Sequence, residues 1–480
     1  MTTTPENPEL ETTEATVAEV APQDRRAETE DLSAEDEAQT ALLRDIVEAV
    51  DGDREARVRA LVEPLHSADL ADLIGLMDAH HRIALVEMLR TDLDPEVLTE
   101  LEGAALEQVI GVLEPTEIAE AMCKLETDDA VEVLQELDKR QRQEVLERVP
   151  GEERIAIEEG LAYPEDSAGR LMQRELIAVP PYWSVGQTLE YLREQDDLPN
   201  DFWEIFVVDP HHKPVGTMPL SWVMRAKSEQ MMSEIMTSEQ TLIPVALDQE
   251  EVAYLFRQYN LVSAAVVDKS ERLVGMITVD DIVDVIDEEA GEDILALAGV
   301  SEGDVNISVR SISRTRFGWL LLNLLTAILA SAVIAMFGAS IEKLVALAVL
   351  MPIVASMGGN AATQTMTVAV RALATRELTA VNTFRVLGKE LAVSMMNGTV
   401  LAIIMGGIAA LWFSNQALGM IIAAAMIINM MVAGLSGILV PVALDRLDID
   451  PAVASPVFVT TITDVVGFLA FLGLAALFLI

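Results

Sequence analysis

The stretch TTITDVVGFLAF, from Thr460 to Phe471, places one carboxylate, Asp464, in an apolar run that contains no Lys or Arg. If a spanning helix starts near Ser455, Asp464 lies about 13 Å along it, near the middle of a bilayer. A carboxylate at that depth costs at least about 2.5–3.5 kcal/mol. Water and a cation in a polar cavity would satisfy it. The alternative is a protonated carboxyl group that is hydrogen-bonded to a neighbouring helix.

Asp464 lies in the last of five apolar segments, each of which is long enough to span a bilayer. The segments cover about 317–337, 341–370, 387–413, 417–444 and 455–480. Basic residues precede the first segment and lie between the second and third, whereas WFSNQALG, after the third, has none. By the positive-inside rule, the N-terminal part is cytoplasmic and the C-terminus lies outside. We expect a multi-pass protein of the cell (inner) membrane.

The net charge separates along the chain. The 480 residues carry a formal charge of −46 although 51% of them are hydrophobic. From Arg310 onward there are nine Lys and Arg and seven Asp and Glu, so the acidic excess lies before that point. This acidic part will repel nucleic acid, which we do not expect as a partner, and will attract cations. The single cysteine, Cys123, excludes an intrachain disulfide, and the N-terminus lacks the pattern of a signal peptide.

The part before the membrane segments is predicted to contain a tail, a helical domain and a connecting segment. Residues 1–38 are rich in Thr, Glu, Pro and Ala, which predicts a disordered acidic tail. Residues 39–163 have helical periodicity with recurring acidic helix starts, typical of a solenoid-like helical domain. Residues 290–316 connect to the membrane domain, 317–480, and turn from acidic to basic along their length.

Residues 164–289 contain an internal repeat, with copies at 164–229 and 230–289. The phrase FVVDPHHKPVGTMPL, 206–220, aligns with AVVDKSERLVGMITV, 265–279. Each phrase predicts two strands around a turn, and each is preceded by a helical pattern. Two α/β copies in tandem resemble a pair of CBS domains.

Two further polar stretches accompany the membrane segments. MGGNAATQT, 357–365, clusters glycines with amide and hydroxyl groups inside the second segment, and DRLDIDP, with Asp445, Asp448 and Asp450, precedes the last. Polar groups at membrane depth indicate a water-filled path or contact within protein. Small-residue helix packing and an ordinary solvated loop are the alternatives for the two stretches. A path of carboxylate, hydroxyl and amide oxygens suits a hard cation such as Mg²⁺. Because each chain supplies one intramembrane Asp to it, we expect a hydrated ion shared across a symmetric dimer.

The order of these parts, with GGNAATQ in the second span and TITDVVG in the fifth, closely resembles the MgtE family of magnesium channels. The resemblance implies a multidomain membrane protein with an α-helical solenoid-like N domain, α/β tandem CBS domains and an all-α transmembrane domain of five helices. It also implies a homodimeric, Mg²⁺-selective, channel-like transporter in the lipid bilayer rather than an enzyme.

The resemblance assigns roles to individual residues. Asp464 and Asp450 would bind the pore ion, and Asn360, Thr460 and Gly467 are candidates to line the pore. The cytoplasmic Mg²⁺ sites would use Asp281, Asp284, Glu289, Glu292, Asp293, Asp128, Glu132, Glu96 and the backbone carbonyl of Gly169. The alternative for these acids is a solvated helix face. Two positions depart from the family pattern. Ala362 stands where a glycine is common, and Asn260 where a ligating aspartate can occur.

The function that follows is a Mg²⁺ pathway closed by high internal Mg²⁺. Clustered acids repel one another, and bridging Mg²⁺ would draw them together and favour a compact, closed state. A carrier coupled to Na⁺ or H⁺, in which Asp464 cycles protons, is the first alternative. The second is a membrane-tethered sensor without transport, because CBS pairs often bind adenine nucleotides.

Overall fold

The computed structural model describes residues 22–101, 103–195, 198–199, 202–300, 309–447 and 449–479. The chain forms two compact units. The first is Met1–Leu125 with Glu132–Gly151, and the second is Glu126–Val131 with Glu152–Ile480. The short segment Glu126–Val131 therefore groups with the repeats and the membrane helices and not with the helical domain to which its sequence assigns it.

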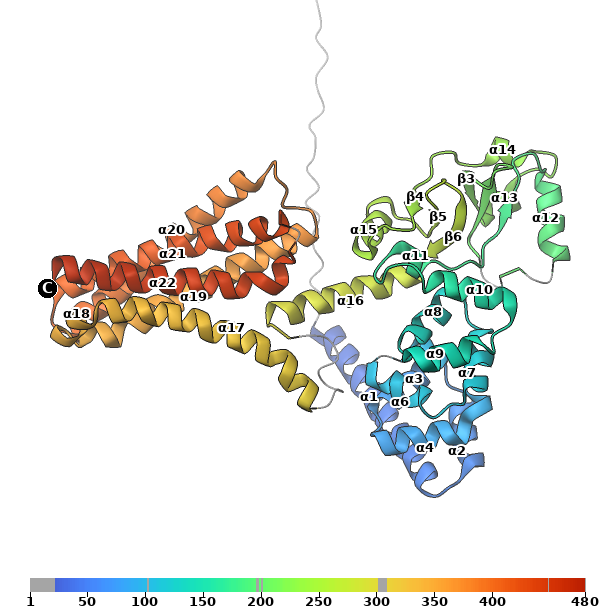
Figure 1. Cartoon of the computed structure of the whole chain (residues 1–480), viewed down its shortest axis with the longest axis horizontal. Helices are drawn as coiled ribbons and strands as arrows, with labels where there is room; N and C mark the ends of the chain where they lie inside the picture. The colour runs from blue at the N-terminus through green and yellow to red at the C-terminus, as the bar shows by residue number, and fades with distance from the viewer. Residues whose placement is uncertain are drawn as a thin grey trace, which may run out of the picture. The chain divides into compact units, whose positions relative to one another are not determined.

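The first unit is helical, as predicted. Its elements are α1 (Pro22–Asp51), α2 (Glu55–Val62), α3 (Ser67–Leu76), α4 (Ala79–Leu89), the 3₁₀ turn η1 (Arg90–Asp92), α5 (Glu96–Thr99), α6 (Gly103–Ile110), α7 (Pro115–Met122), the last four residues of α8 (Thr127–Gln135) and α9 (Lys139–Leu146) (Figure 1). Periodic apolar side chains such as Leu73, Ile74, Leu85 and Leu134 are fully buried between these helices.

The helix pairs α3–α4 and α8–α9 share one capping arrangement. Asp78 caps α4 and Asp138 caps α9, each by accepting from two backbone N–H groups. Four residues after each cap an arginine reaches back to the carbonyl groups that end the preceding helix. Arg82 donates to Ile74, Gly75 and Met77, and Arg142 donates to Leu134, Gln135 and Leu137. These carbonyls lie at the helix ends, where the regular ladder of backbone hydrogen bonds stops, and the arginines supply donors to them.

α1 begins at Pro22, inside the segment that its composition predicts to be a disordered tail. Residues 1–21 lie outside the described residues. The physical reason for the difference is local, because Ala, Glu and Arg have high helix propensity and Pro is favoured at the first helical position. An acidic composition that predicts disorder is equally suited to an acidic helix.

The repeats form two small sheets with the same topology, after α10 (Gly151–Gly160) and α11 (Ala168–Leu171). The first copy contains β1 (Ala178–Val179), α12 (Val185–Glu194), β2 (Glu204–Val208), β3 (Pro214–Pro219) and α13 (Leu220–Arg225). The second contains α14 (Met232–Ile235), β4 (Leu242–Pro244), α15 (Gln249–Tyr259), β5 (Ser263–Val267), β6 (Leu273–Thr278) and α16 (Val279–Leu297).

The register of the two sheets confirms the repeat. In each copy the first strand pairs parallel to the second, and the second pairs antiparallel to the third. Both hairpins shift register at the same place, after Val207 and after Val266. α16 runs on from the second copy as one helix of 19 residues, past the boundary predicted at 289.

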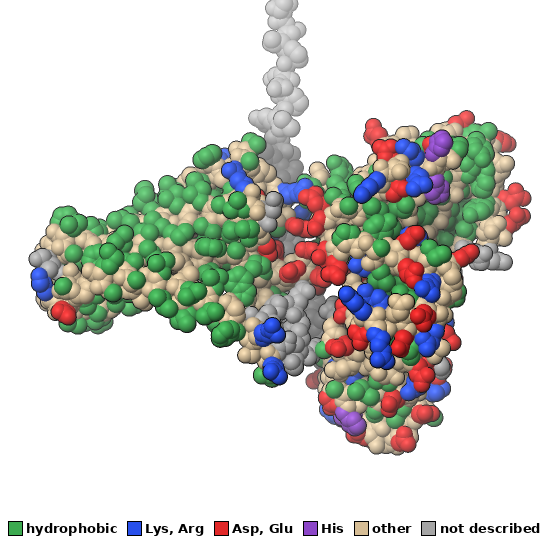
Figure 2. Space-filling model, viewed as in Figure 1, with side chains coloured by type: hydrophobic (Ala, Val, Ile, Leu, Met, Phe, Trp, Pro, Cys, Tyr) green, Lys and Arg blue, Asp and Glu red, His purple; other side chains and the backbone are tan. Residues whose placement is uncertain are grey.

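Five helices of the described residues are long and apolar enough to cross a membrane. They are α17 (Val309–Met336), α19 (Ala346–Ala374), α20 (Thr383–Trp412), α21 (Gln416–Asp445) and α22 (Pro451–Phe478), with the short α18 (Gly338–Lys343) between the first two. α21 packs against α19, α20 and α22 and is the most buried of the five. Figure 2 shows hydrophobic side chains over the visible face of these helices, as a lipid environment requires.

Candidate functional site

Asp464 lies on α22, which packs against α17, α19 and α21, and its side chain is partly buried. The neighbouring Thr463 is fully buried and donates its hydroxyl to the carbonyl of Thr460 at 2.9 Å. Thr460 is partly exposed and donates to the carbonyl of Pro456 at 2.7 Å. Each of these two hydroxyl protons is thus used inside the helix, and of the two residues only Thr460 is partly exposed. Thr463 is therefore a packing residue and Thr460 remains the candidate ligand.

A row of polar side chains follows one side of α19. Its members are exposed and recur every three or four residues: Ser356, Asn360, Thr363, Gln364 and Thr367. Side chains at this spacing share one face of a helix. Polar groups at membrane depth are tolerated where they line water or contact protein, and lipid satisfies neither condition. The row therefore marks the side of α19 that lipid does not cover.

Two motif positions face the interior of the bundle. Gly467 is buried, so the chain itself covers the position that sequence analysis assigned to the pore lining. Ala362 is also buried and packs with Ala296 and Val459. Its methyl group fills space between α16, α19 and α22, which accounts for an alanine at this position.

Asp450 lies in the loop before α22, where it caps that helix. Its Oδ1 accepts from the backbone N–H of Ala452 at 2.7 Å. Asp445 is exposed, and Asp448 lies outside the described residues.

Burial, followed by the negative charges of Asp450 and Glu289, raises the pKa of Asp293 above its usual value. Asp293 and Asp450, predicted as ligands from separate stretches, thus lie within electrostatic reach of each other.

Asp128 is the most deeply buried of the predicted carboxylate ligands. It lies in the first turn of α8, and 9% of its surface is exposed. Its Oδ1 accepts from the backbone N–H of Asp129 at 3.0 Å, and its Oδ2 has no hydrogen-bond partner. Burial and then the negative charge of Asp281 raise its pKa well above the usual value. A buried carboxylate oxygen without a partner is unfavourable, because it has lost its hydrogen bonds to water and accepts none from the protein.

Asp281 and Glu126 lie in the same cluster. Burial raises the pKa of Asp281 to about 7, although the Thr278 hydroxyl donates to its Oδ2 at 2.8 Å. Burial, followed by the negative charge of Glu175, raises the pKa of Glu126 to about 7. We call Glu126, Asp128, Glu175 and Asp281 the acidic cluster. It gathers carboxyl groups from three distant stretches, and a divalent cation would relieve their repulsion.

The carboxyl groups of the acidic cluster lie close together but do not have the geometry of a metal site. Among the described residues, no group of three or more His, Cys, Asp or Glu side chains is arranged to hold a metal ion. The Thr127 hydroxyl donates to Glu175 at 2.7 Å, and the Gln173 amide donates to Glu126. These contacts occupy carboxylate oxygens that a metal would need, so ligation requires the side chains to rearrange.

The other predicted ligands of this unit occupy separate positions. Glu289 accepts from the Gln249 amide at 2.9 Å, and burial raises its pKa. Asp284 and Glu292 are exposed on α16. Gly169 is buried beneath the ring of Tyr163, where an added Cβ would lie 2.6 Å from the ring, so its glycine identity follows from close packing.

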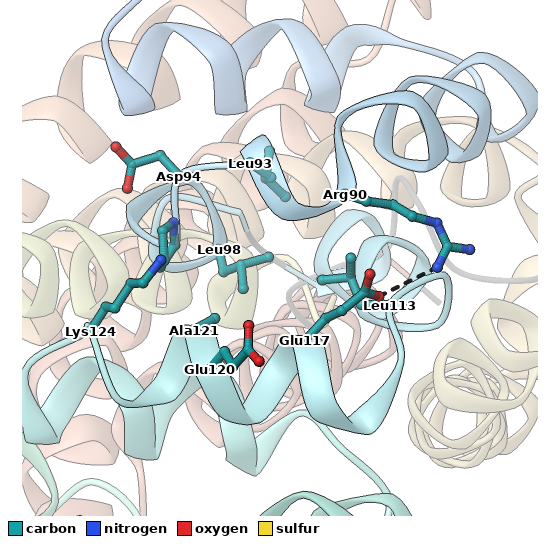
Figure 3. Close-up of a pocket in the computed structure, with 10 residues that line it drawn as sticks. Arg90, Leu93, Asp94, Leu98, Leu113, Glu117, Glu120, Ala121 and Lys124 are labelled. Atoms are coloured by element: carbon teal, nitrogen blue, oxygen red, sulfur yellow. Dashed lines mark hydrogen bonds and ion pairs between the residues drawn. The ribbon is translucent and has the colours of Figure 1, made fainter.

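The helical unit holds the two remaining predicted ligands and a hollow. Glu96 accepts from the Ser67 hydroxyl at 2.9 Å, and Glu132 is exposed. Neither residue lines the hollow (Figure 3). Its lining mixes charges of both signs, with an Arg90–Glu117 ion pair of 3.5 Å on one side: Arg90, Leu93, Asp94, Pro95, Leu98, Leu113, Glu117, Glu120, Ala121 and Lys124. This mixture is not the oxygen-rich set that Mg²⁺ prefers.

Sequence reasoning missed two members of the acidic cluster, Glu126 and Glu175. Both stand beside stretches that it selected, since Glu126 directly precedes TDDAVE and Glu175 follows the AGRLM phrase. Their position next to the selected stretches was the only sequence signal that could have pointed to them. Burial, which raises the pKa of Glu126, is visible only in the fold.

Comparisons with known proteins agree with this architecture. Residues 351–474 match the MgtE divalent cation transporter family, residues 65–166 the MgtE intracellular N domain and residues 232–288 the CBS domain. The magnesium transporter MgtE of Thermus thermophilus is 34% identical, over 89% of this chain and 96% of that protein. That of Bacillus subtilis is 28% identical, over 88% and 94%.

A solved structure, the cytosolic domain of the Mg²⁺ channel MgtE in complex with ATP, is 29% identical and covers 51% of this chain and 99% of that one, with a TM-score of 0.48. The helical domain, the tandem repeats and the five apolar helices occur in the order that the matched domains require. The chain belongs to the MgtE family of magnesium transporters.

Proposed function

We propose that this chain is a Mg²⁺-selective, channel-like transporter that works as a homodimer and closes when internal Mg²⁺ is high. The observation that carries the proposal is the position of Asp464. It is a partly buried carboxylate on a spanning helix packed against α19, the helix that exposes a row of polar side chains. Carboxylate, hydroxyl and amide oxygens together suit a hydrated Mg²⁺.

The homodimer is supported by the same row. Asn360 and its polar neighbours are exposed in a single chain, on a helix that has to lie in lipid. A second copy placed against this face would remove the row from lipid and enclose a path between two copies of Asp464. The cytoplasmic side of the path would then carry Asp450 and Asp293.

The test is Mg²⁺ uptake into liposomes that contain the full-length protein. We expect the wild type to conduct, and Asp464→Asn and Asp464→Ala to fall to the level of protein-free liposomes, because neither variant supplies a carboxylate. Asp445→Asn, an exposed change at the last residue of α21, controls for charge removed at the end of a spanning helix. Equal uptake by the wild type and both Asp464 variants would reject Asp464 as the pore ligand.

A carrier coupled to Na⁺ or H⁺ predicts a different dependence. In that case uptake would follow an imposed Na⁺ or pH gradient, and single-channel currents would be absent. For a passive pathway we expect uptake that follows the Mg²⁺ gradient and the membrane potential alone.

The gate is proposed to use the acidic cluster. Asp128 and Asp281 repel each other when ionised. Asp128 is buried and Asp281 is partly buried, so water screens this repulsion only weakly. Mg²⁺ bound between the segments that carry them would favour the arrangement in which they are close. The ligand shifts this equilibrium only by its higher affinity for the closed arrangement.

Protease protection of the full-length protein tests the gate. We expect millimolar Mg²⁺ to slow cleavage between residues 290 and 316 in the wild type and not in the double variant Asp128→Asn, Asp281→Asn. Cleavage at one rate with and without Mg²⁺ in the wild type would contradict the proposal.

Topology and nucleotide binding stay predictions. We propose that the N-terminal domains are cytoplasmic and that the C-terminus lies outside, from the basic residues that flank the first three spans. Binding of an adenine nucleotide to the CBS pair rests on the domain type alone.

A further inference from the structure

Asn429 is a fully buried amide in the middle of α21, a largely apolar helix. Its Nδ2 donates to the backbone carbonyl of Val354 on α19 at 2.9 Å. Its Oδ1 is also buried and has no hydrogen-bond partner. Its partner on α19 lies 75 positions away, so the sequence pattern does not show what the amide contacts.

The amide occupies a space that two glycines leave open. A Cβ added at Gly358 would lie 2.1 Å from Nδ2, and one added at Gly467 would lie 2.8 Å from it. Gly358 belongs to the GGN stretch of α19, and Gly467 to the TITDVVG stretch of α22. Gly359, beside Gly358, has open space around its added Cβ, so the fit is specific to the glycine that faces Asn429.

Packing alone does not account for an amide at this position. A leucine has the same branching as asparagine and carries no polar atom, so it would fill a similar space without burying an unpaired oxygen. The amide instead forms a bond to α19 that leucine could not form. Its acceptor, Val354, lies one helical turn before Gly358, so the bond holds the backbone at the motif itself.

We propose that Asn429 is a positioning residue of the ion path. Its amide lies between the two motif glycines and fixes α19 and α22 against α21. Asp464 lies three residues before Gly467 on α22. The Asn429 amide therefore sets the position of that carboxylate relative to the polar row of α19. This inference rests on the proposed function of Asp464.

The experiment measures Mg²⁺ uptake by full-length protein in liposomes. The readouts are the Mg²⁺ concentration at half-maximal uptake and the ratio of Mg²⁺ to Ca²⁺ uptake. We expect Asn429→Leu and Gly358→Ala each to raise the half-maximal concentration by about tenfold and to lower the ratio, because a ligand displaced by about 1 Å binds its ion poorly. Gly407→Ala and Gly473→Ala, glycines of spanning helices with open space or a nearest atom at 3.9 Å, are the controls and should resemble the wild type.

A double variant separates positioning from packing. In Gly358→Ala, Asn429→Ala, the added methyl group takes part of the space that the amide vacates, so we expect normal elution and thermal stability. The bond to Val354 is absent, so the half-maximal concentration and the ratio should stay altered. If the double variant regains both transport values, Asn429 only fills space and the proposal is wrong.

Asp464→Asn, measured in parallel, distinguishes the two proposals. If it loses uptake while a folded Asn429→Leu transports like the wild type, the positioning role fails and the pore assignment stands. If Asp464→Asn transports like the wild type, the pore assignment fails and this inference fails with it. Should Asn429→Leu fail to fold, Gly358→Ala and the double variant decide the question.

Discussion

At the scale of single residues, backbone geometry explains why position 260 is an asparagine where the family pattern has an aspartate. Asn260 ends α15 in the left-handed region, with φ of 51°. Asparagine is one of the few side chains that adopt this conformation readily. Its identity therefore follows from the turn after α15, and no weakened sensor site is needed to account for it.

Asp281→Asn tests the residue-scale electrostatics of the acidic cluster. The amide keeps the oxygen that accepts from Thr278 and removes the charge that faces Asp128. We expect the Mg²⁺-free protein to melt at a higher temperature at pH 8, because repulsion is removed, and to lose its response to Mg²⁺. Thermal melting with and without Mg²⁺ measures both effects. Asp287→Asn, an exposed change on the same helix, should leave both unchanged, and a lower melting temperature for Asp281→Asn would contradict the argument.

At the scale of elements, arginine side chains stabilise the ends of two helices in the first unit. Arg82 is 4% exposed and donates to three backbone carbonyls at the end of α3 and to the Gln108 side chain. Removing it would take this donor from the carbonyls of Ile74, Gly75 and Met77. Arg142 repeats most of this arrangement in the later pair α8–α9.

Arg82→Ala should therefore destabilise α3 and α4 by about 3 kcal/mol. Arg140→Ala, whose side chain is 85% exposed and pairs with Glu144, should cost less than about 0.5 kcal/mol. Hydrogen–deuterium exchange of residues 67–89 in the full-length protein measures the local effect. Equal protection in the two variants would show that the capping contacts contribute little.

The same scale shows what could be predicted from the sequence. Long apolar runs placed the membrane helices within a few residues for four of the five spans, because length and hydropathy alone define a span. The first helix begins earlier than its apolar run, since a helix can continue through Arg310, Arg314 and Arg316 outside lipid. Asn429 and Glu175 were out of reach, because their roles arise from contacts between stretches far apart in sequence.

At the scale of the whole molecule, the acidic cluster links stability to pH. Carboxyls whose pKa values are raised to about 7 bind protons more tightly in the folded protein than in the unfolded chain. Their contribution to the free energy of unfolding is present below pH of about 4 and is lost as the pH rises through about 7. Without Mg²⁺, the protein should thus be more easily unfolded at pH 8 than at pH 5.5.

Protons and Mg²⁺ should also compete. At pH 6 these carboxyls are mostly protonated, so the Mg²⁺ concentration that half-protects residues 290–316 from protease should be about tenfold higher than at pH 8 for each proton displaced. The measurement is a Mg²⁺ titration of cleavage at both pH values. In Glu126→Gln, Asp281→Asn the dependence on pH should shrink, and an unchanged dependence would place the titrating groups elsewhere.

α16 connects the acidic cluster to the membrane helices, so a movement of the cluster would be transmitted along it. It is a single helix of 19 residues, about 27 Å long. Asp281 stands at its first turn, and Ala296, at its last, packs with Ala362, Ala452 and Val459 of α19 and α22. A rigid rod of this length acts as a lever: a tilt of about 5° around its first turn moves its far end by about 2 Å. Carboxyl groups that move apart by a fraction of that distance at one end would thereby displace, at the other end, the two helices of the proposed ion path.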